Sequence, residues 1–233
     1  GIEIVNLRHP REQERRERYA HILTQKRQRD GYTFQEANDK MFERNYFGMM
    51  MVETGEADAF ITGLYTKYSN TIKVANEVIG IRPEYKHFGT MHIINSAKGT
   101  LYLADTLINQ DPQAEELVDI AKLSANAVRF FNETPNIAMN SHSNFGSDTS
   151  AGSQKVRDAV KILQETCPEL AVEGEMQIGF ALDKELRDEM YPFNHLKGLD
   201  VNTLIFPNLT SARSSYKMLQ MLDSNVEIIG PVQ

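Results

Sequence analysis

Residues 137–156 read IAMNSHSNFGSDTSAGSQKV, and this stretch contains the clearest indication of the fold class. The apolar run that ends at Met139 is typical of a buried strand, and the amphipathic stretch that begins near Ser153 is typical of a helix. Between them lie small hydroxyl residues and glycine. The order of strand, small polar loop and helix is the repeating unit of α/β proteins.

The same alternation runs along the rest of the chain. Apolar spacing predicts helices that include residues 11–29, 46–54, 72–79, 117–128, 153–163 and 216–222. Strands are expected over residues 1–5, 57–63, 88–94, 100–104, 136–139, 202–206 and 226–231. Strands that alternate with helices predict an α/β fold with a mainly parallel sheet and helices on both faces.

Local signals indicate where elements and domains begin. Thr33 and Glu36 have the spacing of a capping box at the start of a helix. Asp111, followed by a proline, is expected to cap the helix over residues 117–128. A new unit begins near Arg82, so we expect a partial first α/β lobe over residues 1–80 and a second over residues 81–230.

Composition excludes several classes of protein. The 233 residues are 41% hydrophobic and 24% charged, which is typical of a globular chain, and the net charge of -7 argues against a nucleic-acid or anionic membrane surface. The single cysteine, Cys167, excludes an internal disulfide framework and indicates a reducing, cytoplasmic location. No apolar stretch approaches the length that spans a bilayer.

The polar loop after Met139 is the first candidate site. At the carboxyl end of a parallel strand, free N–H groups at the start of the next helix attract anions. The loop residues that offer hydroxyls, amides or close backbone approach are Ser141, Ser143, Asn144, Gly146 and Ser147. The pattern is neither a Walker A loop nor Gly-x-Ser-x-Gly, so no catalytic nucleophile is indicated. A plain surface connection is equally compatible with it.

Other polar positions are weaker candidates. The six histidines lack the spacing of metal ligands, and no metal site is predicted. Asp105, the stretch Glu173-Gly-Glu175 and the stretch Phe206-Pro-Asn208 are expected to be turns at strand ends, where polar groups converge.

Several stretches together resemble the phosphate acetyltransferase/butyryltransferase family along nearly the whole chain. They are, in chain order, Asn45–Gly48, Gly55–Ala59, Ala104–Asp105, Asn109–Glu115, Ser141–Ser147, Glu173–Gln177, Phe206–Leu209 and Ile229–Pro231. Within that family, the loop Ser-His-Ser-Asn-Phe-Gly-Ser is similar to the acetyltransferase-like domain at the C-terminus of large bacterial NADP-dependent malic enzymes. The stretches Thr66–Thr71 and Thr210–Arg213 depart from those of working acetyltransferases.

The resemblance implies two α/β lobes of isocitrate/isopropylmalate dehydrogenase-like topology, with a ligand cleft between them. It implies acetyl-CoA or acetyl phosphate as ligand, held by the 141–147 loop with Thr62 and Gly63 opposite. It also implies that about the first quarter of the domain precedes the chain. The Ser-Arg pair and the Asp that carry acetyl transfer in the family would follow Gln233, so no catalytic residue is assigned.

The function that the resemblance implies is regulation of a malic enzyme. The chain would bind acetyl-CoA as effector and support a homo-oligomer. An N-terminal malic enzyme domain, outside this chain, would convert malate to pyruvate by oxidative decarboxylation with NADP and a divalent metal. Two alternatives stay open: a working phosphate acetyltransferase, and a domain that serves assembly alone.

Overall fold

The computed structural model of the chain describes residues 4–64 and 66–232. It divides into two compact units, Gly1–Arg82 and Pro83–Gln233, and each is considered by itself. Within the described residues, none of the helices combines the length and the apolar character that crossing a bilayer requires.

The regular elements described in the first unit are all helical. They are η1 (Pro10–Glu12), α1 (Gln13–Arg27), η2 (Gln28–Asp30), α2 (Phe34–Lys40), α3 (Arg44–Glu53) and α4 (Tyr68–Val78). The core of the unit lies between α1, α3 and α4, and Tyr19 meets Phe47 there edge to face at 5.2 Å between ring centroids. Full burial of a large apolar side chain contributes about 1.5–3 kcal/mol, so this cluster holds the short helices together.

The capping box predicted at the start of α2 is confirmed. The Thr33 hydroxyl accepts the Glu36 N–H at 3.2 Å, and the Glu36 carboxylate accepts the Thr33 N–H at 3.0 Å. At the other end of the unit, Lys26 on α1 donates to the carbonyls of Val78 and Ile79 at 2.6 and 2.9 Å. A side chain from one helix thus satisfies carbonyls that the end of α4 leaves open.

Within the described residues, the strands expected in the first unit are not formed. Residues 57–63 pair with no strand in the described part of the chain, and the expectation of a strand there is wrong for this structure. Of the strand expected over residues 1–5, the first three lie outside the described residues, and Ile4 and Val5 are not in a strand. A strand is stabilised by backbone hydrogen bonds to a neighbouring strand, and an apolar sequence does not by itself provide that neighbour.

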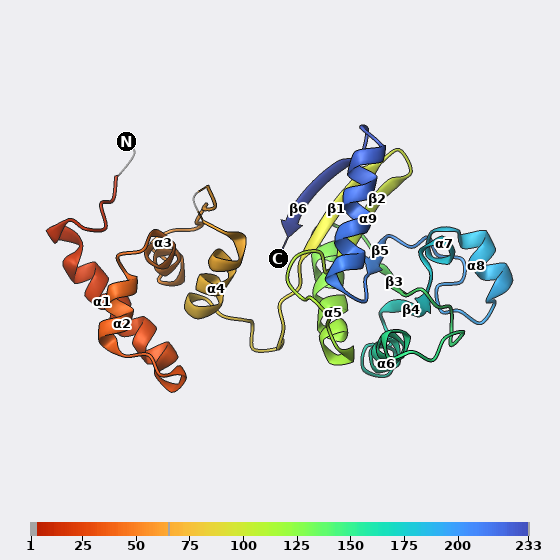
Figure 1. Cartoon of the computed structure of the whole chain (residues 1–233), viewed down its shortest axis with the longest axis horizontal. Coiled ribbons are helices and arrows are strands. Elements are labelled where there is room, and N and C mark those ends of the chain that lie inside the picture. Colours follow the sequence, from red (N-terminus) through yellow and green to blue (C-terminus); the bar gives the residue numbers. More distant parts are fainter. Residues whose placement is uncertain (1–3, 65, 233) are drawn as a thin grey trace. The chain divides into compact units, whose positions relative to one another are not determined.

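The second unit is built on a six-stranded sheet (Figure 1). Its strands are β1 (Met91–Ser96), β2 (Gly99–Ala104), β3 (Asn136–Asn140), β4 (Ala171–Met176), β5 (Thr203–Ile205) and β6 (Glu227–Val232). The order is β4-β3-β5-β2-β1-β6. Pairs β4-β3, β3-β5 and β5-β2 are parallel, whereas β1 runs antiparallel to both β2 and β6. The prediction of an α/β fold with a mainly parallel sheet is therefore confirmed.

Helices cover both faces of this sheet, as predicted. The helices are α5 (Ala114–Phe130), α6 (Ala151–Thr166), α7 (Ile178–Leu182), α8 (Lys184–Met190) and α9 (Leu209–Leu222). Ile137 and Met139 belong to the core with α5 and α6, and Ala138 belongs to the core with α7 and α9. This alternation follows from the two-residue period of a strand, and it explains why β3 is apolar at Ile137, Ala138 and Met139.

Three local expectations in this unit were wrong. The strand expected from Phe88 begins at Met91, because the Thr90 N–H bonds the Asp105 carboxylate at 3.2 Å instead of a neighbouring strand. The cap of α5 is Gln113, whose N–H bonds Glu116, and Asp111 pairs instead with Lys155 on α6.

The third correction concerns residues 173–175, which lie inside β4 and are not a turn. Gly174 adopts a φ of +151°, and a Cβ atom there would lie 2.5 Å from the Met139 carbonyl oxygen. Only glycine lets β4 approach β3 so closely. The close approach brings the next residue, Glu175, beneath the loop that follows β3.

Candidate functional site

The loop between β3 and α6 is tied to the end of β4 by backbone hydrogen bonds. The Ser141 N–H donates to the Met176 carbonyl at 2.9 Å, and the Phe145 N–H donates to the Glu175 carbonyl at 2.8 Å. Phe145 has a positive φ of 46° and Gly146 one of 90°, which turns the chain sharply at this point. The loop is therefore a folded turn around the end of β4 and not an open connection.

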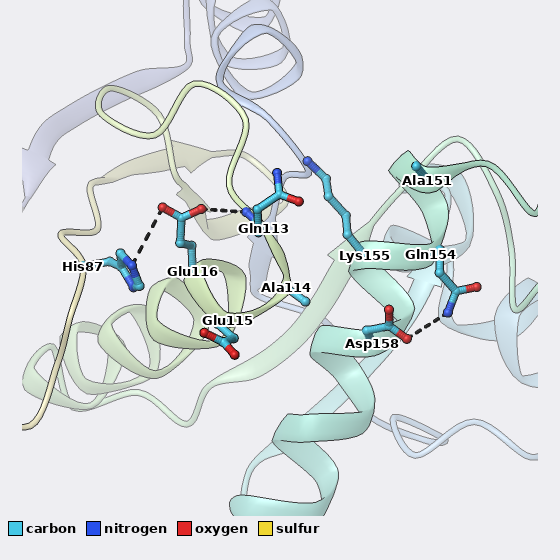
Figure 2. Close-up of a pocket in the computed structure, with 9 residues that line it drawn as sticks. All are labelled: His87, Gln113, Ala114, Glu115, Glu116, Ala151, Gln154, Lys155 and Asp158. Carbon is cyan, nitrogen blue, oxygen red and sulfur yellow. Dashed lines mark hydrogen bonds and ion pairs between the residues drawn. The ribbon is translucent and has the colours of Figure 1, made fainter.

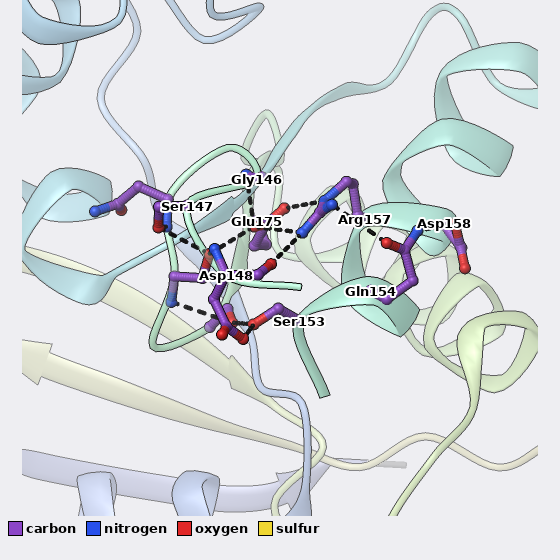
Figure 3. Close-up of polar contacts among 12 residues, drawn as sticks. Gly146, Ser147, Asp148, Ser153, Gln154, Arg157, Asp158 and Glu175 are labelled. Atoms are coloured by element: carbon purple, nitrogen blue, oxygen red, sulfur yellow. Dashed lines mark hydrogen bonds and ion pairs between the residues drawn. The ribbon is translucent and has the colours of Figure 1, made fainter. Parts of the chain in front are cut away.

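The carboxylate of Glu175 lies at the centre of this turn (Figure 3). Its side chain is fully buried, with 0% of its area exposed. The Ser143 hydroxyl donates to Oε1 at 2.8 Å, and the Gly146 N–H donates to the same oxygen at 2.9 Å. A buried carboxylate needs such donors, because an unpaired charge in the interior is very costly.

Arg157, on α6, supplies the positive charge. Its Nε donates to Oε2 of Glu175 at 3.0 Å and its Nη2 to Oε1 at 3.2 Å, while Nη2 also bonds the Asp148 carbonyl at 2.7 Å. Burial alone would raise the pKa of Glu175, but the hydrogen bonds from Arg157, Gly146 and Ser143 outweigh it, so this pKa is lowered. Glu175 is an anion at neutral pH.

Asp148 orders the second half of the loop. Its Oδ2 accepts the Ser150 N–H at 3.0 Å, the Ser153 hydroxyl at 3.1 Å and a bond from His142 Nε2 at 3.1 Å. Hydrogen bonds from the Ser150 hydroxyl and N–H, followed by those from Ser153 and His142, lower the pKa of Asp148 to about 2. The carboxylate thus joins the loop to the first turn of α6, where a negative charge is also favoured by the helix dipole.

The structure brings the predicted loop residues together. The Asn144 N–H donates to the Ser147 hydroxyl at 3.0 Å, which lies 3.0 Å from the Ser143 hydroxyl, and Ser141 lies 3.2 Å from the Ser153 hydroxyl. Ser143 is 1% exposed, whereas Gly146 and Ser147 are exposed. The loop therefore has an inner face that contacts Glu175 and an outer face of exposed residues.

Thr62 and Gly63 belong to the first unit. The Thr62 hydroxyl donates to the Asn45 side-chain carbonyl at 2.7 Å. Both residues line a cavity of about 610 Å³ with Arg44 and Asn45 at the start of α3. Their expected place opposite the loop stays a prediction.

A hollow of about 520 Å³ lies in the second unit at the starts of α5 and α6 (Figure 2). His87, which lines the hollow, has its Nδ1 2.9 Å from an Asp119 oxygen and its Nε2 3.8 Å from a Glu116 oxygen. Across the described residues, no group of three or more His, Cys, Asp or Glu side chains is placed to hold a metal ion.

The match to known proteins covers the whole chain. The model of the phosphate acetyl/butaryl transferase family matches residues 1–233. The chain belongs to this family. It is 37% identical over 233 residues to the NADP-dependent malic enzyme of Escherichia coli (strain K12), covering 99% of this chain and 30% of that protein. The chain thus spans about a third of the length of that malic enzyme.

Family members with transferase names are similar as well. The phosphate acetyltransferase of Bacillus subtilis (strain 168) is 34% identical over 200 residues, covering 86% of this chain and 61% of that protein. The EutD phosphotransacetylase from Staphylococcus aureus has a TM-score of 0.84 at 27% identity, and the match covers 100% of this chain and 70% of that one. The predicted resemblance to this family is confirmed.

Sequence reasoning missed the charged residues that organise the loop of this family member. The sequence pattern predicts a turn at Glu175 and assigns no role to Arg157 or Asp148. The available signal was a carboxylate in an otherwise buried strand, since such a group needs a cation and several donors close by.

Proposed function

We propose that the chain is an acyl-CoA-binding regulatory domain of a malic enzyme, with acetyl-CoA as effector. The observation that carries the proposal is the identity with the E. coli NADP-dependent malic enzyme, which extends over nearly the whole chain. In that arrangement the chain is the C-terminal part of a longer polypeptide.

The state of the loop supports an effector site over a phosphoryl-transfer site. A transferase that uses acetyl phosphate needs donors directed at the phosphoryl oxygens. Here the Ser143 hydroxyl and the Gly146 N–H are directed at Glu175. We propose that acyl-CoA meets the loop at its outer face, chiefly at Gly146 and Ser147. The residues proposed to meet the ligand are Ser141, Asn144, Gly146, Ser147, Thr62 and Gly63, whereas the Ser143 hydroxyl holds Glu175.

The remaining parts of the proposal concern the rest of the enzyme. NADP and a divalent metal would bind in an N-terminal malic enzyme domain, where malate is converted to pyruvate. This chain would transmit the effector signal and contribute to a homo-oligomer in the cytoplasm.

Two assays on one preparation of the polypeptide that carries this chain test the proposal. The first measures malate-dependent reduction of NADP with and without acetyl-CoA, and we expect acetyl-CoA to change the rate. The second measures acetyl-CoA formation from acetyl phosphate and CoA, and we expect none above background. Malate turnover that does not respond to acetyl-CoA would refute the regulatory role.

A working phosphate acetyltransferase is the second candidate. It is favoured by the similarity in fold to the EutD phosphotransacetylase from S. aureus. The reaction would be direct attack of the CoA thiolate on the acetyl carbonyl, with phosphate as leaving group, assisted by positioning and charge neutralisation. Steady acetyl-CoA production in the second assay would establish this alternative.

A further inference from the structure

The inner face of the 141–148 loop has the donor set of an anion site. It presents a serine hydroxyl, a backbone N–H beside a residue of positive φ, and a guanidinium. Small loops with these groups bind phosphate and carboxylate anions in many proteins. In this chain all three groups point at one place, and the Glu175 carboxylate fills it (Figure 3).

Both oxygens of Glu175 accept hydrogen bonds. Oε1 accepts from Ser143, Gly146 and Arg157, and Oε2 accepts from Arg157. A second anion on the inner face would have to take these donors from Glu175 and lie against its charge in a buried place. The Glu175 carboxylate and an anion in contact with it would repel each other strongly, because water is excluded there.

We infer that the Glu175 carboxylate occupies the anion-binding position formed by Ser143, Gly146 and Arg157. In doing so it excludes phosphate and phosphoryl ligands from the inner face of the loop. Glu175 thereby determines the specificity of the loop, because only the outer face, with Gly146 and Ser147, is left for a ligand. Arg157 is the positioning residue that holds Glu175 in place. The biological meaning rests on the proposed function, whereas the test below measures anion binding and not malate turnover.

Replacing the carboxylate by an added anion is the direct test. Glu175→Ala removes the carboxylate and leaves its donors around a small cavity, and formate is the probe that fits there. We expect formate to raise the melting temperature of Glu175→Ala by several degrees, since a ligand at about 100 times its Kd stabilises by roughly 2.7 kcal/mol. The wild type should gain no more than it does from chloride at equal ionic strength.

Glu173→Ala is the matched control. Glu173 lies on the same strand, is also buried, and accepts the His195 N–H at 2.8 Å and the Gly174 N–H at 2.9 Å, but it makes no hydrogen bond to the loop. Its removal should destabilise the protein without creating a response to formate. Equal responses of the two variants, or none from Glu175→Ala, would overturn the inference.

A second measurement on stable proteins decides the question if Glu175→Ala does not fold. Inorganic phosphate is titrated into the wild type and into Ser143→Ala, with binding followed by phosphorus NMR. We expect the two titrations to be the same, because the Ser143 hydroxyl serves Glu175 and not a ligand. The inference would be refuted if phosphate binding is saturable and weakens about fivefold or more in Ser143→Ala, which corresponds to roughly 1 kcal/mol. That result would show that the inner face of the loop is open to phosphate.

Discussion

Arg157 and Glu175 form a two-point ion pair that joins α6 to β4. Nε lies 3.0 Å from Oε2 and Nη2 lies 3.2 Å from Oε1, so the planar guanidinium meets both carboxylate oxygens. Arg157 also bonds the Asp148 carbonyl of the loop. One side chain therefore fixes strand, loop and helix relative to one another, a geometry that lysine cannot reproduce.

Arg157→Met should destabilise the second unit strongly. Removing one partner leaves the buried Glu175 charge uncompensated, which typically costs about 3–5 kcal/mol. Urea unfolding followed by circular dichroism measures the loss. Lys161→Met is the control, because Lys161 is exposed on the same helix and makes no hydrogen bond or ion pair in the described part of the chain. A loss below about 1 kcal/mol for Arg157→Met would mean that the pair is not formed in solution.

The stability of the protein should fall at acid pH through Glu175. Because its folded pKa is lowered, its stabilisation is fully present above the unfolded value of about 4.3 and is lost as pH falls through the folded pKa. The difference in unfolding free energy between wild type and Glu175→Gln should therefore be constant near neutral pH and should shrink below about pH 4. A difference that does not change with pH would contradict the ionised, paired state of Glu175.

The contribution of Asp148 to stability should also be lost as pH falls, but over a lower pH range. Its pKa is lowered to about 2, so its contribution is complete above the unfolded value of about 3.9 and disappears as pH falls toward 2. NMR titration of the Asp148 carboxyl carbon checks this directly. Ser150→Ala removes one donor and should move the midpoint upward, whereas an unchanged midpoint would show that the Ser150 hydroxyl does not bond Asp148.

Gly174→Ala should destabilise the sheet. The added Cβ would lie 2.5 Å from a backbone oxygen of β3, and alanine tolerates the φ of +151° poorly, so we expect a cost above about 2 kcal/mol. Gly152→Ala is the matched control, since a Cβ there meets nothing within 4 Å and the position is helical. That change should be neutral or stabilising by up to about 1 kcal/mol. Thermal unfolding of both variants measures the contrast, and equal effects would contradict the close contact of β3 and β4.

Lys26→Met should loosen the end of α4. The variant leaves the carbonyls of Val78 and Ile79 without their donor, at a cost of about 1–3 kcal/mol. Amide hydrogen exchange in the last turn of α4 should become faster. Arg29→Met is the control, because Arg29 is exposed and has no hydrogen bond or ion pair in the described residues. Equal exchange in the two variants would exclude the contact.

The parallel part of the sheet could be predicted because its signals are local. The apolar run up to Met139 and the polar loop after it report a buried strand and its end, and the structure places β3 at Asn136–Asn140. Whether residues 57–63 form a strand could not be predicted from local signals. Its formation depends on a neighbouring strand, which an apolar stretch alone does not reveal.

The interior of the loop could not be predicted because its contacts are distant in sequence. Ser143 meets Glu175 across 32 positions, and Arg157 meets it across 18. The serine and glycine pattern is compatible with an anion-binding loop and with a plain surface connection. It could not indicate that the anion in that loop belongs to the chain itself.

Direct binding of acetyl-CoA tests the central claim. Isothermal titration of acetyl-CoA into the polypeptide that carries this chain should give a saturable isotherm, which weakens in Ser147→Ala and is unchanged in Ser214→Ala, an exposed serine of α9. Free phosphate should not compete, because Glu175 occupies the inner face of the loop. No binding of acetyl-CoA, or binding that phosphate abolishes, would contradict the account.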